Sequence, residues 1–301
     1  MTEILVIKHG ALGDIVLATA AFAAIRKQHA DARISVLTSK PYAALLAQSP
    51  YFDAVLVDEK PKLWQLSKLR RLRQLLNSQQ WEWIYDLQNS SRTRRYPALL
   101  AQPWPKISGA TPHITHPRPA YDTTIHAFAN LEAQLASAGI AMGSRPDVAW
   151  LKADTPTIAK PYALLVPGGA AHRPEKRWPH YAALAQRIAE QGMTPVLLGT
   201  KAEETVLAEI VVQVPQAVNL CGQTSIAQLA ELARGAALAI GNDTGPMHVI
   251  AAANCPSTVL FSSASDPVRA APMGASVTVR RAENLADLSV ESVLASLTGR
   301  A

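Results

Sequence analysis

The hydrophobic pattern alternates between two kinds of segment along almost the whole chain. Short apolar runs, the first of them ILVIK at residues 4–8, are followed by longer stretches in which apolar side chains recur every three or four positions. Short runs are typical of buried strands, and the longer pattern is typical of amphipathic helices. Their regular alternation predicts mostly parallel sheets with helices on both faces.

Two such series are separated by residues 139–161, which hold two glycines and three prolines, have little periodicity and indicate a linker. The first series predicts strands at residues 4–8, 33–37, 53–57, 83–87 and 106–109. The second predicts strands at residues 162–166, 194–199, 217–221, 237–242 and 257–261, and a closing helix at 288–297. We therefore expect an α/β chain of two doubly wound domains, residues 1–150 and 151–301, which bind ligand where their strands end at a shared cleft.

The composition is that of a globular chain with an aliphatic core. Of the 301 residues, 49% are hydrophobic, 6% aromatic and 17% charged, which argues against disorder and against a coiled coil. No apolar run approaches the roughly 20 residues of a membrane helix, and the first residues lack the basic region of a secretory signal. Cys221 and Cys255 have neither a CxxC spacing nor nearby histidines, so we expect two thiols in a reducing cytosol and no metal site.

Positive charge is concentrated in the first domain. Residues 60–106 hold ten bases against two acids, a local excess of eight in a chain whose net charge is +6. A solvated basic helix is one interpretation, but so concentrated an excess favours a polyanionic acceptor, a membrane surface or nucleic acid; nucleic acid is the weaker of these because no zinc-finger or RNP-like signature is present. A leucine stripe from Leu63 to Leu76 is expected to pack this basic helix onto the sheet. The candidate acceptor contacts are Lys62, Arg70, Arg71, Arg73 and Arg92.

The turn after the first strand reads KHGALGD, residues 8–14. Its glycines allow a tight turn and a close approach to a ligand, but the GxxG spacing differs from the GxGxxG of dinucleotide-binding folds. No acid follows the second strand in the ribose-binding position, which argues against a nicotinamide cofactor. Asp14 stands at the predicted helix start. It is either an N-cap carboxylate or a general base at the mouth of the cleft.

Three strand ends of the second domain carry candidate ligand contacts. The first ends in PGGAAHRPEKRWP (167–179), a glycine turn followed by cationic groups that suit phosphate, although a solvated basic loop fits as well. Another ends in GNDTGPMH (241–248), where a helix start suits a diphosphate and Asp243 suits a sugar hydroxyl. At the third, Glu203 or Glu204 could accept hydrogen bonds from a ribose, or could be first-turn acids placed by the helix dipole.

The motifs KHGALGD, EKRWP, GNDTGPMH and FSSASDP together resemble the ADP-heptose:lipopolysaccharide heptosyltransferases of glycosyltransferase family nine. The resemblance extends from Ile4 to about Pro272. It implies a GT-B fold, in which two Rossmann-like domains face each other across a cleft. The first domain would bind the acceptor and the second the nucleotide sugar. It also implies an inverting, metal-independent transfer from ADP-heptose or a related donor to an anionic glycan such as the lipopolysaccharide inner core.

The resemblance also assigns roles to individual positions. Asp14 matches the catalytic base, and Lys176 matches the lysine that binds the donor phosphate and stabilises the leaving group. The donor site would be formed by Gly168, Gly169, His172, Lys176, Glu203 (or Glu204), Asp243, Thr244, Gly245 and His248. No metal and no cofactor are expected, and the absence of a DxD triplet agrees with metal independence.

The expected partners are a nucleotide-diphosphate sugar and an anionic glycan or lipopolysaccharide acceptor, with no nucleic acid. The expected location is the cytoplasm, with peripheral contact with the cytoplasmic face of the inner membrane. Two alternatives stay open. One is a nucleotide-sugar epimerase or hydrolase on the same fold, which would turn over the donor without an acceptor. The other is a non-catalytic sugar-nucleotide-binding protein.

Overall fold

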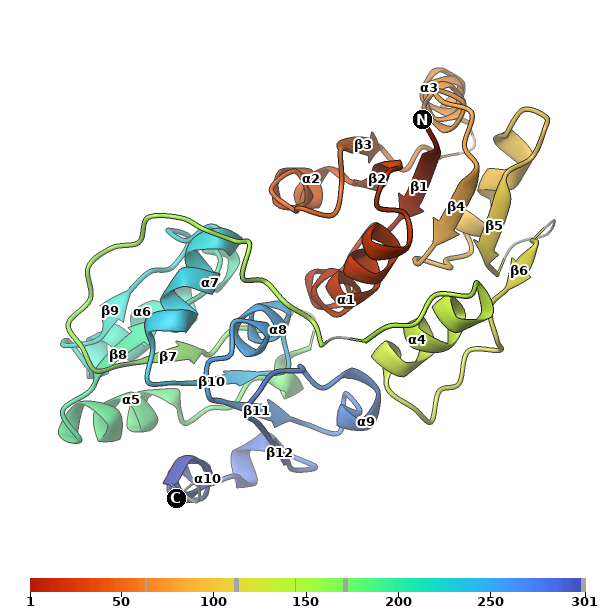
Figure 1. Cartoon of the computed structure of the whole chain (residues 1–301). Helices are drawn as coiled ribbons and strands as arrows, with labels where there is room; N and C mark the ends of the chain where they lie inside the picture. Colours follow the sequence, from red (N-terminus) through yellow and green to blue (C-terminus); the bar gives the residue numbers. More distant parts are fainter. Residues whose placement is uncertain (63, 111–113, 144, 170–172, 299–301) are drawn as a thin grey trace. The chain divides into compact units, whose positions relative to one another are not determined.

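The computed structural model of the chain (Figure 1) describes residues 1–62, 64–110, 114–143, 145–169 and 173–298. The chain divides into two compact units, residues 1–144 and 145–301. The division lies a few residues before the predicted boundary between residues 150 and 151. Each unit is built on one six-stranded parallel sheet, so the predicted doubly wound α/β architecture is confirmed.

The strand order of unit 1 is β3-β2-β1-β4-β5-β6. Its strands are β1 (Glu3–Ile7), β2 (Arg33–Ser39), β3 (Ala54–Asp58), β4 (Trp83–Asp86), β5 (Lys106–Gly109) and β6 (His116–Pro117). Its helices are α1 (Leu12–Gln28), α2 (Lys40–Leu46), α3 (Leu66–Leu76), the 3₁₀ helix η1 (Thr93–Leu99) and α4 (Ala127–Ser137). The chain builds outward from β1 to β3, then returns and builds the other half of the sheet from β4.

Helices cover both faces of the unit 1 sheet because its strands are apolar on both sides. On one face, α3 and η1 pack Leu72, Leu76 and Tyr96 against Leu5 of β1 and Ile84 of β4. On the other face α1, whose apolar side chains are nearly all buried, packs beside α4 (Figure 1). This burial supplies most of the stabilisation of the unit.

Unit 2 repeats this topology with the order β12-β11-β10-β7-β8-β9. Its strands are β7 (Tyr162–Val166), β8 (Thr194–Leu197), β9 (Val218–Asn219), β10 (Leu238–Asn242), β11 (Ser257–Phe261) and β12 (Val277–Arg281). Its helices are η2 (Pro174–Lys176), α5 (Tyr181–Glu190), η3 (Lys201–Glu203), α6 (Glu204–Gln213), α7 (Ile226–Gly235), α8 (Gly245–Ala252), α9 (Pro267–Ala270), η4 (Leu285–Asp287) and α10 (Val290–Thr298).

The core of unit 2 joins α5, α6 and the closing helix α10 to one face of the sheet. Tyr181, Leu207 and Val293 from these helices contact Leu165 and Ile240 of the central strands, and all five side chains are buried. Helices α7 and α8 pack against each other elsewhere in the unit. Because β7 and β10 are covered in this way, their residues are almost uniformly apolar up to the point where the chain leaves the sheet.

The differences from the predicted elements have local causes. Strand β6 has two residues and β12 ends in two arginines, so neither has the apolar run that marks a strand. Between β4 and β5 the chain forms the 3₁₀ helix η1 rather than an α-helix, and η1 contains Pro97. A proline removes an N–H donor and disfavours a regular α-helix at that point.

The leucine stripe of the basic helix is only partly buried. Leu72 and Leu76 are in the core, Leu69 is half-buried and Leu66 is 64% exposed. Leu63 lies outside the described residues. The predicted packing on the sheet is therefore correct for the second half of α3 and wrong for its first turn, which contributes no residue to the core.

Substitutions at the two ends of the stripe should separate these environments. We expect Leu72→Ala to lower the free energy of unfolding by about 2–5 kcal/mol, because it removes packed core atoms and leaves a cavity. The matched variant Leu66→Ala should change it by no more than about 0.5 kcal/mol, as for other exposed positions. Urea unfolding followed by circular dichroism measures both. Equal losses would contradict the placement of α3.

Candidate functional site

The topology creates one candidate site in each unit. In unit 1 the sheet reverses its direction of growth between β1 and β4, and in unit 2 between β7 and β10. The loops that leave the carboxyl ends of such a strand pair go to opposite faces of the sheet and leave a crevice between them. The sequence motifs singled out above follow three of these four strands.

The loop after β1 makes a tight turn at Gly10. Its φ is +124°, and a Cβ at this position would lie 2.4 Å from Cε2 of Tyr42, so any other residue would clash. Helix α1 then starts at Leu12, and Asp14 is its third residue rather than its N-cap. The N-cap role considered for Asp14 is therefore wrong, because the N-cap residue is Ala11. The carboxylate still binds a backbone donor, because Oδ2 accepts a hydrogen bond of 3.0 Å from the N–H of Ala11.

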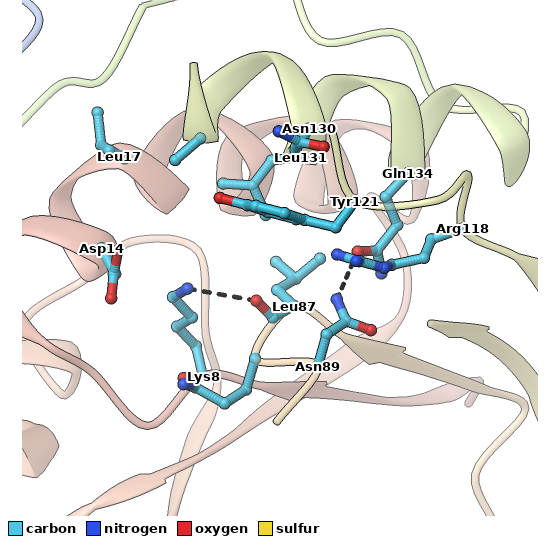
Figure 2. Close-up of a pocket in the computed structure, with 12 residues that line it drawn as sticks. Lys8, Asp14, Leu17, Leu87, Asn89, Arg118, Tyr121, Asn130, Leu131 and Gln134 are labelled. Carbon is cyan, nitrogen blue, oxygen red and sulfur yellow. Dashed lines mark hydrogen bonds between the residues drawn. The ribbon is translucent and has the colours of Figure 1, made fainter. Parts of the chain in front are cut away.

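A cavity of about 210 Å³ opens beside Asp14, between the loops that follow β1 and β4 (Figure 2). Lys8 is almost completely buried in its wall, and its Nζ donates a hydrogen bond of 3.2 Å to the carbonyl oxygen of Leu87. Burial lowers the pKa of Lys8, while the charges of Asp14 and Asp86 oppose this shift. The cavity therefore has a desolvated amine and an exposed carboxylate in its lining.

Arg118 and Tyr121 line the same cavity, and the guanidinium lies 5.0 Å from the centre of the Tyr121 ring. Burial and the charge of Arg94 lower the pKa of Arg118, and within the described ranges no carboxylate forms a salt bridge with it. Gln134 accepts a 2.8 Å hydrogen bond from the amide of Asn89 (Figure 2). These residues have the features of a subsite for a polar, negatively charged ligand.

The sequence interpretation missed this subsite. Arg118 and Tyr121 follow the two-residue strand β6, and Asn89 and Gln134 are ordinary polar residues in sequence. The available signal was the segment HPRPAYD (116–122), which places an arginine and a tyrosine near each other after a strand end. That signal needs β6 to be recognised as a strand first.

The predicted acceptor contacts are not in this cavity. Lys62 is exposed, and its Nζ lies 5.0 Å from the Trp64 ring. Arg71 forms a 2.9 Å salt bridge with Glu59, which also pairs with Lys68 at 3.2 Å, and Arg92 donates to the carbonyl of Pro61 at 2.8 Å. Arg70 and Arg73 are exposed on α3. Glu59, one residue before the stretch counted in the sequence, thus offsets part of its charge.

A buried polar cluster lies beneath the KHGALGD loop. His9 and Asp58 are both nearly inaccessible, and Nε2 of His9 lies 3.2 Å from Oδ2 of Asp58. The hydroxyl of Tyr96 donates to the same carboxylate oxygen, and the N–H of Lys60 donates to the other at 2.7 Å. Burial lowers the pKa of His9 to about 4, although the charge of Asp58 raises it.

In unit 2 the Gly-rich turn after β7 is held by Asn242, which ends β10. The fully buried amide donates to the carbonyls of Pro167 and Gly168 at 2.9 and 3.0 Å, and its oxygen accepts from the hydroxyl of Tyr181 at 3.2 Å. Asn242 is the second residue of the GNDTGPMH motif, and no role was predicted for it. Its role in the structure is to fix the two strand ends against each other.

Glu203 lies against the Gly-rich turn. Its Oε2 accepts hydrogen bonds of 2.8 and 3.0 Å from the N–H and hydroxyl of Thr200, and a Cβ on Gly168 would overlap its carboxylate. Glycine is therefore required at position 168 for this contact. Glu204 is exposed at the start of α6. Of the two candidate acids, Glu203 is the one beside the turn.

Lys176 and Asp243 form a salt bridge of 2.7 Å, and their side chains are 14% and 12% exposed. The pair lies at the start of α8, where Thr244 is the N-cap residue and its side chain makes no capping hydrogen bond. His248 is buried one turn further along α8. The structure thus brings together the EKRWP and GNDTGPMH motifs, which are far apart in sequence.

Other cations of the basic loop are used within the fold. Arg177 donates to the carbonyl of Gly169 at 2.9 Å, and Arg173 donates to that of Ala264 at 3.3 Å. The prediction for His172 lies outside the described residues. Both cysteines are free, and burial raises the pKa of Cys255 to about 12.

Two absences hold for the part of the chain that the structure describes. No cluster of three or more His, Cys, Asp or Glu residues there could hold a metal ion. No helix there has the length and apolar character needed to span a membrane.

Comparison with known proteins places the chain in a class. The model of glycosyltransferase family 9 (heptosyltransferase) matches residues 122–295, more than half of the chain. The chain therefore belongs to glycosyltransferase family 9, as the sequence resemblance predicted.

Individual relatives are similar over different extents. The chain is 35% identical over 120 residues to lipooligosaccharide heptosyltransferase 2 of Haemophilus influenzae, a match that covers 38% of this chain and 34% of that protein. The matched segment is thus about a third of the length of the curated relative.

Among solved structures, the family 9 glycosyl transferase of Veillonella parvula has a TM-score of 0.85 at 20% identity, covering 98% and 95% of the two chains. E. coli heptosyltransferase WaaC with ADP has a TM-score of 0.81 at 19% identity, covering all of both chains. The predicted GT-B fold class is confirmed by these likenesses.

The buried His9 predicts how the stability of the protein responds to acid. Its folded-state pKa of about 4 lies below the usual 6.5, so the unfolded chain takes up a proton first as the pH falls. We expect this contribution to be complete above pH 6.5 and to be lost progressively towards pH 4, by about 1.4 kcal/mol for each pKa unit of difference.

Urea unfolding of the wild type and of His9→Gln at pH 7 and pH 5 isolates the effect, because the other titratable groups are common to both proteins. The wild type should lose more stability between these pH values than the variant. An equal loss in the two proteins would show that His9 does not titrate in this way.

Proposed function

We propose that the protein is an inverting glycosyltransferase that needs no metal ion and transfers a heptose from ADP-heptose to an anionic glycan such as the lipopolysaccharide inner core. Family membership supports the class of reaction. The observation that carries the proposal is the arrangement of the unit 2 site, where the Lys176–Asp243 pair, the Gly-rich turn and the start of α8 come together. Unit 1 supplies an exposed carboxylate beside a separate cavity.

The transfer is a single displacement. Asp14 takes the proton from an acceptor hydroxyl, and the oxygen attacks the anomeric carbon of the donor. The bond between that carbon and the phosphate oxygen breaks, and ADP leaves with the electron pair. Attack from the face opposite the leaving group inverts the anomeric configuration. Asp14 is suited to this role because its carboxylate is exposed and, among the described residues, accepts a hydrogen bond from the N–H of Ala11 alone.

The leaving diphosphate is stabilised by unit 2. Lys176 is already held at the site by Asp243, so little ordering is needed when the donor binds. The N–H groups at the start of α8, around Thr244 and Gly245, add the positive end of a helix dipole. Such groups provide electrostatic stabilisation that a divalent cation provides in other enzymes. Glu203 and Asp243 have the acceptor oxygens that sugar hydroxyls require, and His248 is buried beneath the turn.

The acceptor is bound by the cavity beside Asp14. A sugar ring can lie against Tyr121, while Arg118 and the amine of Lys8 attract its negative charge. The side-chain oxygen of Asn89, which accepts no hydrogen bond from the described residues, offers an acceptor to its hydroxyls. Proton transfer requires the acceptor hydroxyl to reach Asp14, which lines the same cavity. Lys62, Arg70, Arg73 and Arg92 contribute attraction over a longer range.

Two variants separate the proposed roles of the units. Asp14→Asn should abolish transfer and leave the dissociation constant of ADP unchanged, because the carboxylate acts only on the acceptor. Lys176→Met should weaken ADP binding by about 1–3 kcal/mol, the range for a charge-assisted hydrogen bond. Calorimetry with ADP and a transfer assay with ADP-heptose measure these effects. Transfer at the wild-type rate by Asp14→Asn would contradict its role as the base.

The same assay without acceptor tests the alternatives. Rapid loss of ADP-heptose with no acceptor present would favour a hydrolase or an epimerase. Binding of ADP with no turnover of any donor or acceptor would favour a non-catalytic binding protein.

We also propose that Trp64 and the first turn of α3 contact an anionic membrane surface, where a lipid-linked acceptor is held. Trp64 and Leu66 are 73% and 64% exposed, although both are large apolar residues. Exposed bases surround them, including Lys62 and Arg70. Tryptophan beside basic side chains is favoured at the boundary between lipid and water. This contact would place the enzyme at the cytoplasmic face of the inner membrane.

Vesicle binding tests this surface. The double variant Trp64→Ala/Leu66→Ala should bind vesicles of phosphatidylcholine and phosphatidylglycerol about 10-fold more weakly than the wild type, a loss of roughly 1.4 kcal/mol. The matched control is Val212→Ala, because Val212 is 81% exposed on α6 of unit 2. Sedimentation with the vesicles gives the bound fraction. Equal binding by all three proteins, or no binding by the wild type, would contradict the contact.

A further inference from the structure

We propose that His9 is a positioning residue that holds the loop bearing Asp14 in its reactive geometry. The inference rests on the proposed role of Asp14 as the base. His9 is the second residue of the KHGALGD motif, and it has no part in the proposed proton transfer or in donor binding. Its side chain is 96% inaccessible and does not line the cavity, so it acts through the residues that follow it rather than on the substrate.

The backbone of His9 joins the ends of three strands. Its N–H donates a hydrogen bond of 2.9 Å to Oε1 of Gln88, which follows β4. Its carbonyl accepts one of 2.5 Å from the hydroxyl of Ser39, the last residue of β2. The adjacent N–H of Lys8 donates to the carbonyl of Leu37 at 3.0 Å. The loop is thus anchored on both sides of β1 at the point where it leaves the sheet.

The imidazole adds a connection to β3 and η1. Nε2 lies 3.2 Å from Oδ2 of Asp58, the last residue of β3, and the hydroxyl of Tyr96 donates to the same oxygen. The ring centres of His9 and Tyr96 are 6.1 Å apart in an edge-on contact. His9, Asp58 and Tyr96 form a buried cluster in which the ring of His9 has little freedom to rotate.

Asp14 is separated from this cluster by only five positions, and two of the intervening steps are fixed. Gly10 has a φ of +124° and is closely packed against Tyr42. Ala11 donates its N–H to the carboxylate of Asp14 at 3.0 Å. A change in the position of His9 therefore shifts Gly10 and Ala11, and with them the carboxylate. A displacement of about 1 Å at a reacting group can reduce the rate of an enzyme by about 100-fold.

The charges around His9 keep its imidazole neutral. The pKa of His9 is lowered to about 4, most strongly by burial, and the nearby cations Lys60, Arg92 and Lys8 act in the same direction. Asp58 alone acts in the opposite direction. A neutral imidazole has one N–H, and the proximity of Nε2 to a carboxylate places that proton on Nε2. At 3.2 Å from Oδ2 of Asp58 this proton is attracted by the carboxylate, although the contact lacks the alignment of a hydrogen bond.

Kinetics of two variants with a matched control test the proposal. His9→Leu keeps the volume but removes the donor, and we expect its kcat to fall about 10- to 100-fold, with the Kd of ADP unchanged. His9→Gln retains an N–H donor and should recover much of that loss. The control is His29→Leu, since the ring of His29 also contacts a tyrosine, with Nε2 2.8 Å from the Tyr85 hydroxyl in a partly buried hydrogen bond, but at the other end of α1.

The pattern of outcomes is decisive. A His9→Leu kcat equal to that of the wild type, or a loss no larger than that of His29→Leu, would overturn the positioning role. If Asp14→Asn is inactive at the same time, only this inference fails. If Asp14→Asn is fully active, the proposed function fails instead.

A spectroscopic measurement reports on the His9 ring of the wild type directly. In a ¹⁵N–¹³C correlation spectrum at pH 7, we expect the His9 ring to carry its proton on Nε2, and to lose this signature in Asp58→Asn. A ring protonated on Nδ1, or on both nitrogens, would contradict the pairing with Asp58 and the proposal with it.

Discussion

The reversal of strand order at the centre of each parallel sheet is the constraint on which the rest depends. Because the chain builds outward from β1 and then restarts at β4, the loops after these strands separate and leave a crevice. The same reversal occurs between β7 and β10. The cavity beside Asp14 and the Lys176–Asp243 pair both lie at these positions, although no sequence motif is shared between them. The topology therefore decides where chemistry can occur, and the loops decide which chemistry.

Each crevice places charges in surroundings of low polarity and compensates them locally. Lys8 is buried but donates to a main-chain carbonyl, and Asp58 is buried but accepts from Tyr96 and Lys60. Lys176 and Asp243 neutralise each other. Uncompensated buried charges would cost several kcal/mol each, so these partnerships are conditions for the fold as well as for the site. They also hold the charged groups in fixed positions before a substrate arrives, which favours the transition state.

The sequence predicted the parts of the structure that depend on local pattern. Strands such as Tyr162–Val166 and Ser257–Phe261 were found because their apolar runs are buried on both faces. Strands β6 and β12 were missed because edge position allows polar or very short segments. Asp14 was found, but its position within α1 was wrong, because helix α1 begins two residues earlier with an alanine as its N-cap.

Contacts between distant residues could not be predicted in the same way. Both Lys176 and Asp243 were singled out, yet their salt bridge depends on the pairing of β7 with β10. Arg118 and Tyr121 could not be predicted as cavity residues, because their position depends on the pairing of the short strand β6 with β5. The number of unpaired positive charges in residues 60–106 was overestimated, because Glu59, just outside that stretch, pairs with Lys68 and Arg71. In each case the contact depends on how helices, strands and loops pack together, and the periodicity of the sequence carries no information on that packing.

The most direct test of the central claim is the anomeric configuration of the product. With ADP-heptose as donor and a purified glycan acceptor, the coupling constants of the new glycosidic linkage can be measured by NMR and compared with those of the donor. A single displacement assisted by the lone carboxylate of Asp14 gives inversion at the anomeric carbon. Retention of configuration would require a second displacement or a different base, and would contradict the roles assigned to Asp14 and Lys176.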